Sequence, residues 1–141
     1  MTMPQPLPAE LIQAFTETDY IVHHEPPFTM NIGQPCPALK ALMAEHNALC
    51  AAYITAWNPF SQQLSRQKNE ARQNEMKADL KMRGLKFIEG IGQHPSNNWP
   101  GEPSVLVLDL DIDAAKSLAG HNEQHAFVWV GSDAVPELVR P

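Results

Sequence analysis

Cysteine and long apolar runs are both scarce in this 141-residue chain. Its two cysteines, Cys36 and Cys50, form no Cys-x-x-Cys pair, so we expect free thiols in a reducing compartment. No segment approaches the roughly 20 apolar residues that a membrane-spanning helix requires. The first residues lack a basic stretch followed by an apolar run, so we expect no signal peptide. These absences together predict a soluble cytoplasmic protein.

Positive charge is also in short supply. The formal net charge is −6, from 10 Lys and Arg against 16 Asp and Glu. General, charge-driven binding of nucleic acids needs a basic surface, so this class of function is disfavoured. Most of the basic residues fall within residues 68–86. We interpret them as the solvated face of a long helix, with a local basic patch as the alternative.

Familiar catalytic and metal-binding signatures are absent from the sequence, including the P-loop, GxGxxG and GxSxG motifs. His121 and His125 flank Glu123, which invites a zinc interpretation. The helical zinc motif, however, needs both histidines on one continuous helix. We expect Gly120 to end a helix before His121, so we predict no metal site.

Proline, by contrast, is abundant at the start of the chain. Seven of the 13 prolines precede residue 40, so residues 1–49 are predicted to form a proline-rich wrap that belongs to the same domain as residues 50–141. The wrap is expected to contain a helix over 9–16, extended pieces over 20–24 and 28–32, and a helix over 37–46.

From residue 50 onward the pattern becomes regular and predicts an α+β core. The expected elements are strands over 50–57, 85–92, 104–110 and 126–131, helices over 65–83 and 111–119, a loop over 94–101, and a turn or short helix over 133–139. The order β-α-β-β-α-β predicts a ferredoxin-like sheet with two helices covering one face. The N-terminal helix, extended pieces and second helix would decorate this core.

The expected helix over 65–83 carries two rows of side chains. At about 100° per residue, Ser65, Asn69 and Arg72 share one side near the positive end of the helix dipole. The other row is apolar and is predicted to face the sheet; it consists of Leu64, Ala71, Ala78, Met82 and Leu85.

Polar residues gathered where a buried strand passes into a helix N-terminus are typical of a small-ligand or anion site. The guanidinium of Arg72 suits a carboxylate or phosphate. The predicted ligand-binding residues are Asn58, Ser61, Ser65, Asn69, Arg72, Glu102 and Gln124.

The same residues also admit a purely structural interpretation. Ser65 or Ser61 would cap the helix, Asn69 would fix the Asn58-Pro59 turn, and Arg72 would pair with an internal acid such as Glu102.

The polar pattern of residues 50–139 resembles a bacterial family known only as domain of unknown function 3293. The resemblance implies a small cytoplasmic α/β domain with a shared polar cluster, and it implies no activity. It rests on Thr55, Ala56, Asn58, Pro59, Ser61, Leu64, Ser65, Asn69, Arg72, Gly84, Gly90, Trp99, Glu102, Pro103, Ser104, Gln124 and Ala126.

Three classes of function remain open at this point. The first is a domain that binds a small anionic ligand, with a nucleotide as one candidate. The second is an enzyme in which Glu102 acts as acid or base and Arg72 stabilises charge. The third is a protein-interaction or inhibitor module that uses an exposed loop around Trp99. The sequence indicates no particular cofactor.

Overall fold

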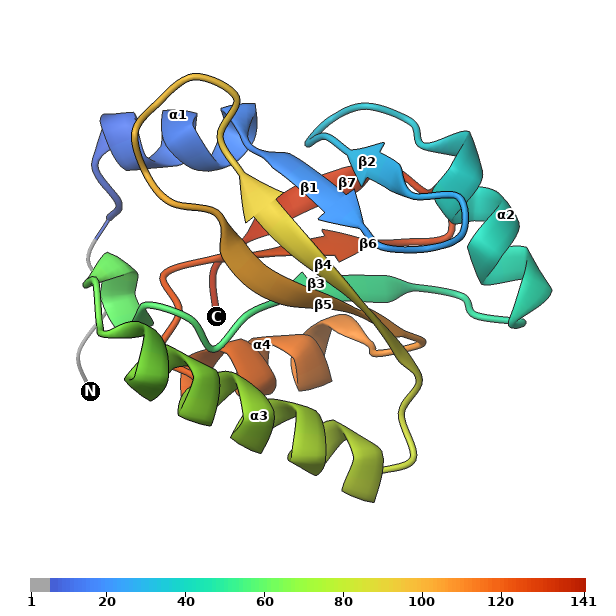
Figure 1. Ribbon diagram of the computed structural model, residues 1–141. Coiled ribbons are helices and arrows are strands. Elements are labelled where there is room, and N and C mark those ends of the chain that lie inside the picture. Colours follow the sequence, from blue (N-terminus) through green and yellow to red (C-terminus); the bar gives the residue numbers. More distant parts are fainter. Residues whose placement is uncertain (1–5) are drawn as a thin grey trace.

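The computed structural model describes residues 6–141, which form a mixed α+β structure (Figure 1). The helices are α1 (Ala9–Glu17), α2 (Pro37–Glu45), α3 (Arg66–Met82) and α4 (Ile112–His121), with a 3-10 turn, η1, at Pro59–Ser61. The strands are β1 (Asp19–Val22), β2 (Phe28–Met30), β3 (Ala51–Ile54), β4 (Phe87–Gln93), β5 (Glu102–Leu108), β6 (Phe127–Val130) and β7 (Pro136–Val139). No helix within residues 6–141 is long and apolar enough to cross a membrane.

All of these strands join one seven-stranded antiparallel sheet in the order β2-β1-β4-β5-β3-β6-β7. The predicted α+β class is confirmed. The predicted ferredoxin-like sheet is not, because β1 and β2 extend the sheet on one side and β7 extends it on the other. Residues 133–139 were expected to form a turn or helix and instead contain β7, whose four residues are too few to give a clear period-2 signal.

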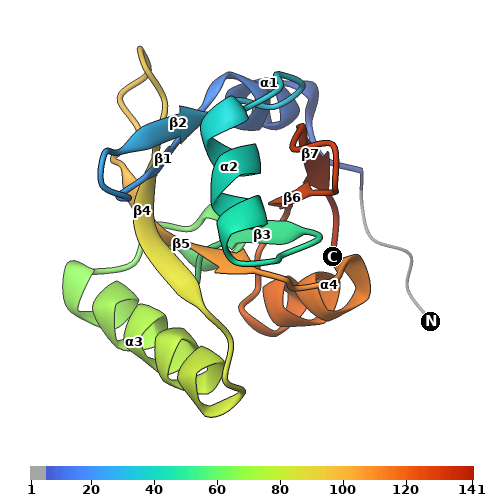
Figure 2. The same cartoon turned by 90° about the vertical axis from the view of Figure 1, so that its right-hand side faces the viewer.

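The two faces of the sheet are covered by different helices (Figures 1 and 2). Helices α3 and α4 lie on one face, where Leu80 and Leu118 pack against Ile54 of β3 and Val107 of β5. Helix α2 lies on the other face. The residues of β3, and those of β5 from Val105 to Leu108, are therefore apolar, because these segments are buried on both sides.

The sheet curls, and its two edges are joined at one end. The N–H of Gly33, just after β2, donates to the carbonyl of Pro136 at 2.8 Å, and the N–H of Cys36 donates to the carbonyl of Ala134 at 3.1 Å. Helix α2 starts directly after this link and fills the concave face there with Leu39. Helix α1 lies over the other end of the same face (Figure 1).

The row of α3 side chains that faces the sheet differs from the predicted row. Its buried residues are Asn69, Gln73, Met76 and Leu80. Met82, which was predicted to face the sheet, is 88% exposed. The reason is chemical, because the amides of Asn69 and Gln73 find hydrogen-bond partners on the backbone after β3 and so tolerate burial.

Helix α4 also runs further than expected. It continues through Gly120 to His121, and Asn122 caps it by donating its side-chain amide to the carbonyl of Leu118 at 2.9 Å. The left-handed residue after the helix is Glu123, with φ of 57°. The prediction that Gly120 ends this helix was therefore wrong.

Candidate functional site

A cavity of about 240 Å³ lies between α1 and the concave face of the sheet. One part of its wall is apolar and comes from α1 and the last strands, at Leu11, Ala14, Phe15, Val128 and Leu138. Another part is polar and comes from the end of β3, the start of β5 and the loops beside them, at Thr55, Asn58, Ser61, Trp99, Glu102, Ser104 and Gln124. The cavity thus has an apolar wall and a polar end.

Glu102, the first residue of β5, is the acidic side chain among the lining residues. Its Oε2 atom accepts two hydrogen bonds of 2.9 Å, one from Nδ2 of Asn58 and one from the indole Nε1 of Trp99. Burial raises the pKa of the Glu102 carboxyl, and these two hydrogen bonds only partly oppose the rise. The carboxyl is therefore held rigidly in surroundings that disfavour its charge.

This pKa shift predicts a pH-dependent stability. Because the folded chain holds the Glu102 proton more tightly than the unfolded chain does, stability falls as pH rises from the ordinary value of 4.5 through the raised pKa. In Glu102→Gln this contribution disappears, so the variant should gain stability relative to wild type across the same interval. Urea denaturation at a series of pH values measures the difference. Glu10→Gln, on exposed α1, controls for the loss of one negative charge, and parallel curves for Glu102→Gln and wild type would contradict the prediction.

Asn58 is held in place by Asn69, which projects from the second turn of α3. The side-chain oxygen of Asn69 accepts the Asn58 backbone N–H at 2.8 Å, and its amide donates to the Asn58 side-chain oxygen at 2.8 Å. The same Asn58 oxygen also accepts the N–H of Leu64 at 3.1 Å. Asn69 therefore orients the amide that holds Glu102.

The turn that follows β3 has an unusual backbone. Asn58, Phe60 and Ser61 all have positive φ, at 49°, 50° and 58°, although none of them is glycine. Such conformations cost free energy and persist only where the surroundings enforce them. Two sets of hydrogen bonds hold this backbone in place. Asn58 pairs with Asn69, and the N–H of Phe60 donates to the carbonyl of Glu123.

Two tyrosines form the floor of the cavity. The rings of Tyr20 and Tyr53 meet edge to face, with centroids 5.5 Å apart. Burial raises the pKa of both phenols, so both stay protonated at neutral pH and act as donors. Tyr20 donates to the carbonyl of Phe15 in α1, and Tyr53 donates to the carbonyl of Ile21 at 2.7 Å.

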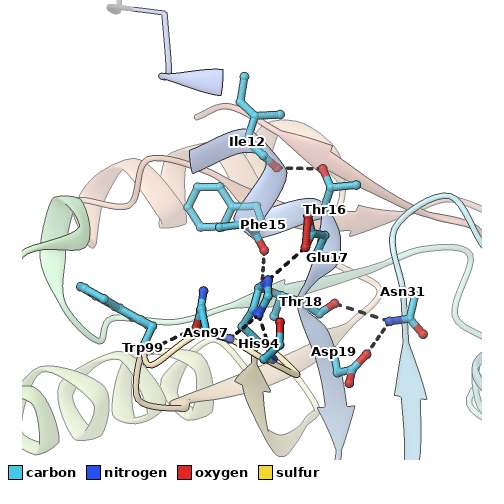
Figure 3. Close-up of polar contacts among 12 residues, drawn as sticks. Ile12, Phe15, Thr16, Glu17, Thr18, Asp19, Asn31, His94, Asn97 and Trp99 are labelled. Carbon is cyan, nitrogen blue, oxygen red and sulfur yellow. Dashed lines mark hydrogen bonds and ion pairs between the residues drawn. The ribbon is translucent and has the colours of Figure 1, made fainter. Parts of the chain in front are cut away.

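His94 connects α1 to the loop that precedes β5 (Figure 3). Its Nδ1 atom accepts the backbone N–H groups of Ser96 and Asn97 at 3.1 and 3.0 Å, which places the proton of the neutral ring on Nε2. Nε2 lies 3.3 Å from a carboxylate oxygen of Glu17, at the end of α1. His94 thereby fixes both the loop at the mouth of the cavity and the helix above it.

The predicted ligand-binding residues divide into two groups. Four of them line the cavity together: Asn58, Ser61, Glu102 and Gln124. Ser65, Asn69 and Arg72 do not line it. Ser65 caps α3 by accepting the N–H of Lys68 at 3.2 Å, and Asn69 fixes the turn, as the structural interpretation anticipated.

Arg72 pairs with the chain after α4 and not with Glu102. Its Nε donates to the carbonyl of Ala56 at 2.9 Å, one terminal nitrogen donates to the carbonyl of Asn122 at 2.9 Å, and the other lies 3.5 Å from Glu123. Its guanidinium therefore joins the end of β3 to the end of α4.

Loss of this guanidinium should destabilise the fold. Arg72→Ala leaves the carbonyls of Ala56 and Asn122 without their charged donor, and we expect a loss of about 2 kcal/mol. Urea denaturation measures it. Arg66→Ala is the matched control, because the Arg66 side chain is 85% exposed and pairs with Glu70 on the same helix, so its loss should cost less than about 0.5 kcal/mol. Equal effects of the two substitutions would refute the structural role.

Sequence reasoning missed several residues that build the cavity. Tyr20 lies in a segment assigned to a peripheral wrap, and Tyr53 lies in a strand too uniformly apolar to mark an inward face. Gln73 was also missed; it does not line the cavity but supports the end of β3, where its side-chain oxygen accepts the N–H of Ala56 at 2.9 Å. Its spacing of four residues from Asn69 on one helix face was the available signal.

Comparison with known proteins identifies the family. Residues 54–127 match a family described as "Protein of unknown function (DUF3293)". The chain belongs to this family. No curated protein and no solved structure matches it. The DUF3293 match includes the polar end of the cavity, with Asn58, Glu102 and Gln124, whereas α1 and its apolar wall lie outside the matched residues.

Proposed function

We propose that this DUF3293 protein binds a small molecule in the cavity beneath α1. The observation that carries the proposal is the contrast inside the cavity, where one rigidly held carboxyl, that of Glu102, faces a largely apolar wall. Binding sites for small molecules have this composition, since apolar walls supply affinity and a few fixed polar groups set orientation. The strained turn at Asn58–Ser61 adds support, because strain of this kind concentrates at functional sites.

The size of the cavity limits the ligand. A 150 Å³ apolar cavity holds benzene, so by proportion a cavity of about 240 Å³ holds roughly ten non-hydrogen atoms. This corresponds to one ring with a short substituent. A whole nucleotide, the candidate that the sequence suggested, is larger than this and would need α1 to move.

The experiment is a thermal-shift panel of single-ring amines, alcohols, amides, carboxylates and phosphates, with nucleotides included to test the sequence-based expectation. Ligand at about 100 times its Kd stabilises a protein by roughly 2.7 kcal/mol, a shift of several degrees in Tm.

A matched pair of variants places any binding in the cavity. Ala14→Phe puts a ring into the cavity from α1, whereas Gln13→Phe puts the same ring on the exposed side of that helix. We expect Ala14→Phe to abolish the shift and Gln13→Phe to preserve it. Equal shifts in the two variants, or no shift with any compound, would refute the proposal.

One observation favours an enzyme as the second candidate. A carboxyl whose pKa is raised by burial holds a proton more readily than an exposed carboxyl does, as a general acid must, and Glu102 is such a group inside a cavity. Arg72 would take no direct part, because its guanidinium is bound to backbone carbonyls away from the cavity. Incubation of a bound compound with wild type and Glu102→Gln, followed by mass spectrometry, tests this. Conversion by wild type alone, at concentrations that saturate the variant with the compound, would establish catalysis.

A further inference from the structure

The hydrogen-bond donors on the strands around the cavity are already used by the protein itself. Tyr53 donates to the carbonyl of Ile21 at 2.7 Å, Thr55 donates to that of Pro103 at 2.6 Å, and Ser104 donates to that of Glu102 at 3.0 Å. Tyr20 likewise donates to a carbonyl of α1. The strands therefore offer a ligand almost no donor.

The donors next to the carboxyl are used as well. Asn58 and Trp99 both donate to Oε2 of Glu102, and the side-chain amide of Gln124 donates to the backbone carbonyls of Trp57 and Asn122 at 3.2 and 3.1 Å. Among residues 6–141, the lining side-chain donors without a protein acceptor lie on loops or the short turn, at Ser61, Asn97 and His125.

The carboxyl of Glu102, by contrast, has a hydrogen-bond acceptor that the described residues do not use. Both hydrogen bonds to Glu102 reach Oε2, and in the part of the chain that the structure describes no donor reaches Oε1. Glu102 lines the cavity, and no side-chain oxygen or nitrogen among the described residues is both buried and without a partner, so Oε1 keeps accessible surface. The cavity therefore presents a carboxyl oxygen as a free acceptor, beside strand donors that the protein itself already uses.

The charges in the cavity lining also favour a cationic ligand over an anionic one. The lining contributed by residues 6–141 contains the carboxyl of Glu102, the imidazoles of His94 and His125, and no Lys or Arg. An anion would enter beside this carboxyl and without the permanent positive charge of a Lys or Arg, which is costly in an apolar cavity. A cation would instead stabilise the charged form of the Glu102 carboxyl, whose Oε1 accepts no hydrogen bond from the described residues.

We propose, on the basis of the binding function above, that the ligand class is a small, largely apolar amine whose nitrogen donates to Oε1 of Glu102. The apolar part lies against Leu11, Phe15 and Leu138, and the amine lies at the polar end. This assigns Glu102 as the residue that selects a cationic nitrogen donor and rejects carboxylates and phosphates.

The test uses four probes of nearly equal size, namely benzylamine, benzyl alcohol, benzoate and toluene. Protein-observed NMR titration measures their Kd values with wild type and with Glu102→Gln, which keeps an oxygen acceptor for Asn58 and Trp99 and removes the charge. We expect benzylamine to bind wild type at least about tenfold more tightly than benzoate does. Glu102→Gln should weaken benzylamine about tenfold and leave toluene unchanged.

The possible failures are distinguishable. If benzoate binds as tightly as benzylamine, with shifts at cavity residues, the amine class is overturned while the cavity remains a binding site. If benzylamine binds wild type and Glu102→Gln equally, Glu102 is not the selecting group and the inference is again overturned. If none of the four probes binds, or if Ala14→Phe and Gln13→Phe respond alike, the binding function itself fails, and the amine inference fails with it.

Discussion

Replacing Gly90 with alanine should destabilise the protein by about 3 kcal/mol or more, a drop of about 10 °C in Tm. Gly90 lies in β4, between β1 and β5. A Cβ atom there would lie 2.1 Å from the backbone oxygen of Ile21 and 2.8 Å from the hydroxyl of Tyr53. The Ile21 carbonyl cannot move away without disturbing β1, and the Tyr53 hydroxyl is bound to that same carbonyl. Urea denaturation followed by circular dichroism measures the loss.

Gly92 provides the matched control, since it lies two residues further along the same strand. A Cβ atom at Gly92 would meet its nearest neighbour, a methyl carbon of Thr18, at 3.8 Å, which is ordinary contact. Gly92→Ala should therefore change stability by less than about 1 kcal/mol. Equal losses from the two substitutions would mean that backbone freedom, and not the close approach of β1, explains the need for glycine at position 90.

Asn69→Ala should have the second largest effect, with a loss of about 3 kcal/mol. Asn69 is 2% exposed and makes hydrogen bonds to the backbone N–H of Asn58, to the Asn58 side chain and to the carbonyl of Leu64. Removing it leaves buried polar groups without partners. The substitution also frees the Asn58 side-chain amide, so the Glu102 carboxyl should be oriented less firmly. Urea denaturation measures the loss of stability, and the benzylamine titration measures the effect on Glu102.

Ser65→Ala controls for a general weakening of α3. The Ser65 side chain accepts the N–H of Lys68, so its loss should cost about 1 kcal/mol as a missing helix cap. It should leave probe binding unchanged. If Ser65→Ala impairs binding as much as Asn69→Ala does, the integrity of α3 matters more than the Asn58–Asn69 pair.

Local signals in the sequence were sufficient to place most elements. Ser65 and Asp111 were recognised as starts of helices, and both accept the expected backbone N–H three residues on. The loop over 94–101 lies between β4 and β5 as expected. These features depend on a few neighbouring residues, and local chemistry determines them.

Sheet membership depends on distant segments, and here prediction from sequence failed. Strands β1 and β2 have proline-rich surroundings that are typical of peripheral chain, yet β1 pairs with β4, which lies about seventy residues later. Nothing within a short window of β1 encodes that partner.

The candidate site was predicted in part for the same reason. Asn58 and Glu102 were selected because each lies beside a buried strand, and the structure brings them to 2.9 Å. Arg72 was selected for its chemistry, and its partners, the carbonyls of Ala56 and Asn122, are backbone atoms that no side-chain pattern reveals.

The shallow packing of α1 has a consequence for how this protein can change. None of the nine residues of α1 is buried, yet Leu11, Ala14 and Phe15 form part of the cavity wall. Substitutions at these positions resize the cavity without removing a residue on which the core depends. The polar end, by contrast, is tied to α3 and the sheet through Asn58. The size of the cavity is therefore free to drift in evolution, or to be redesigned, while its polar end stays constant.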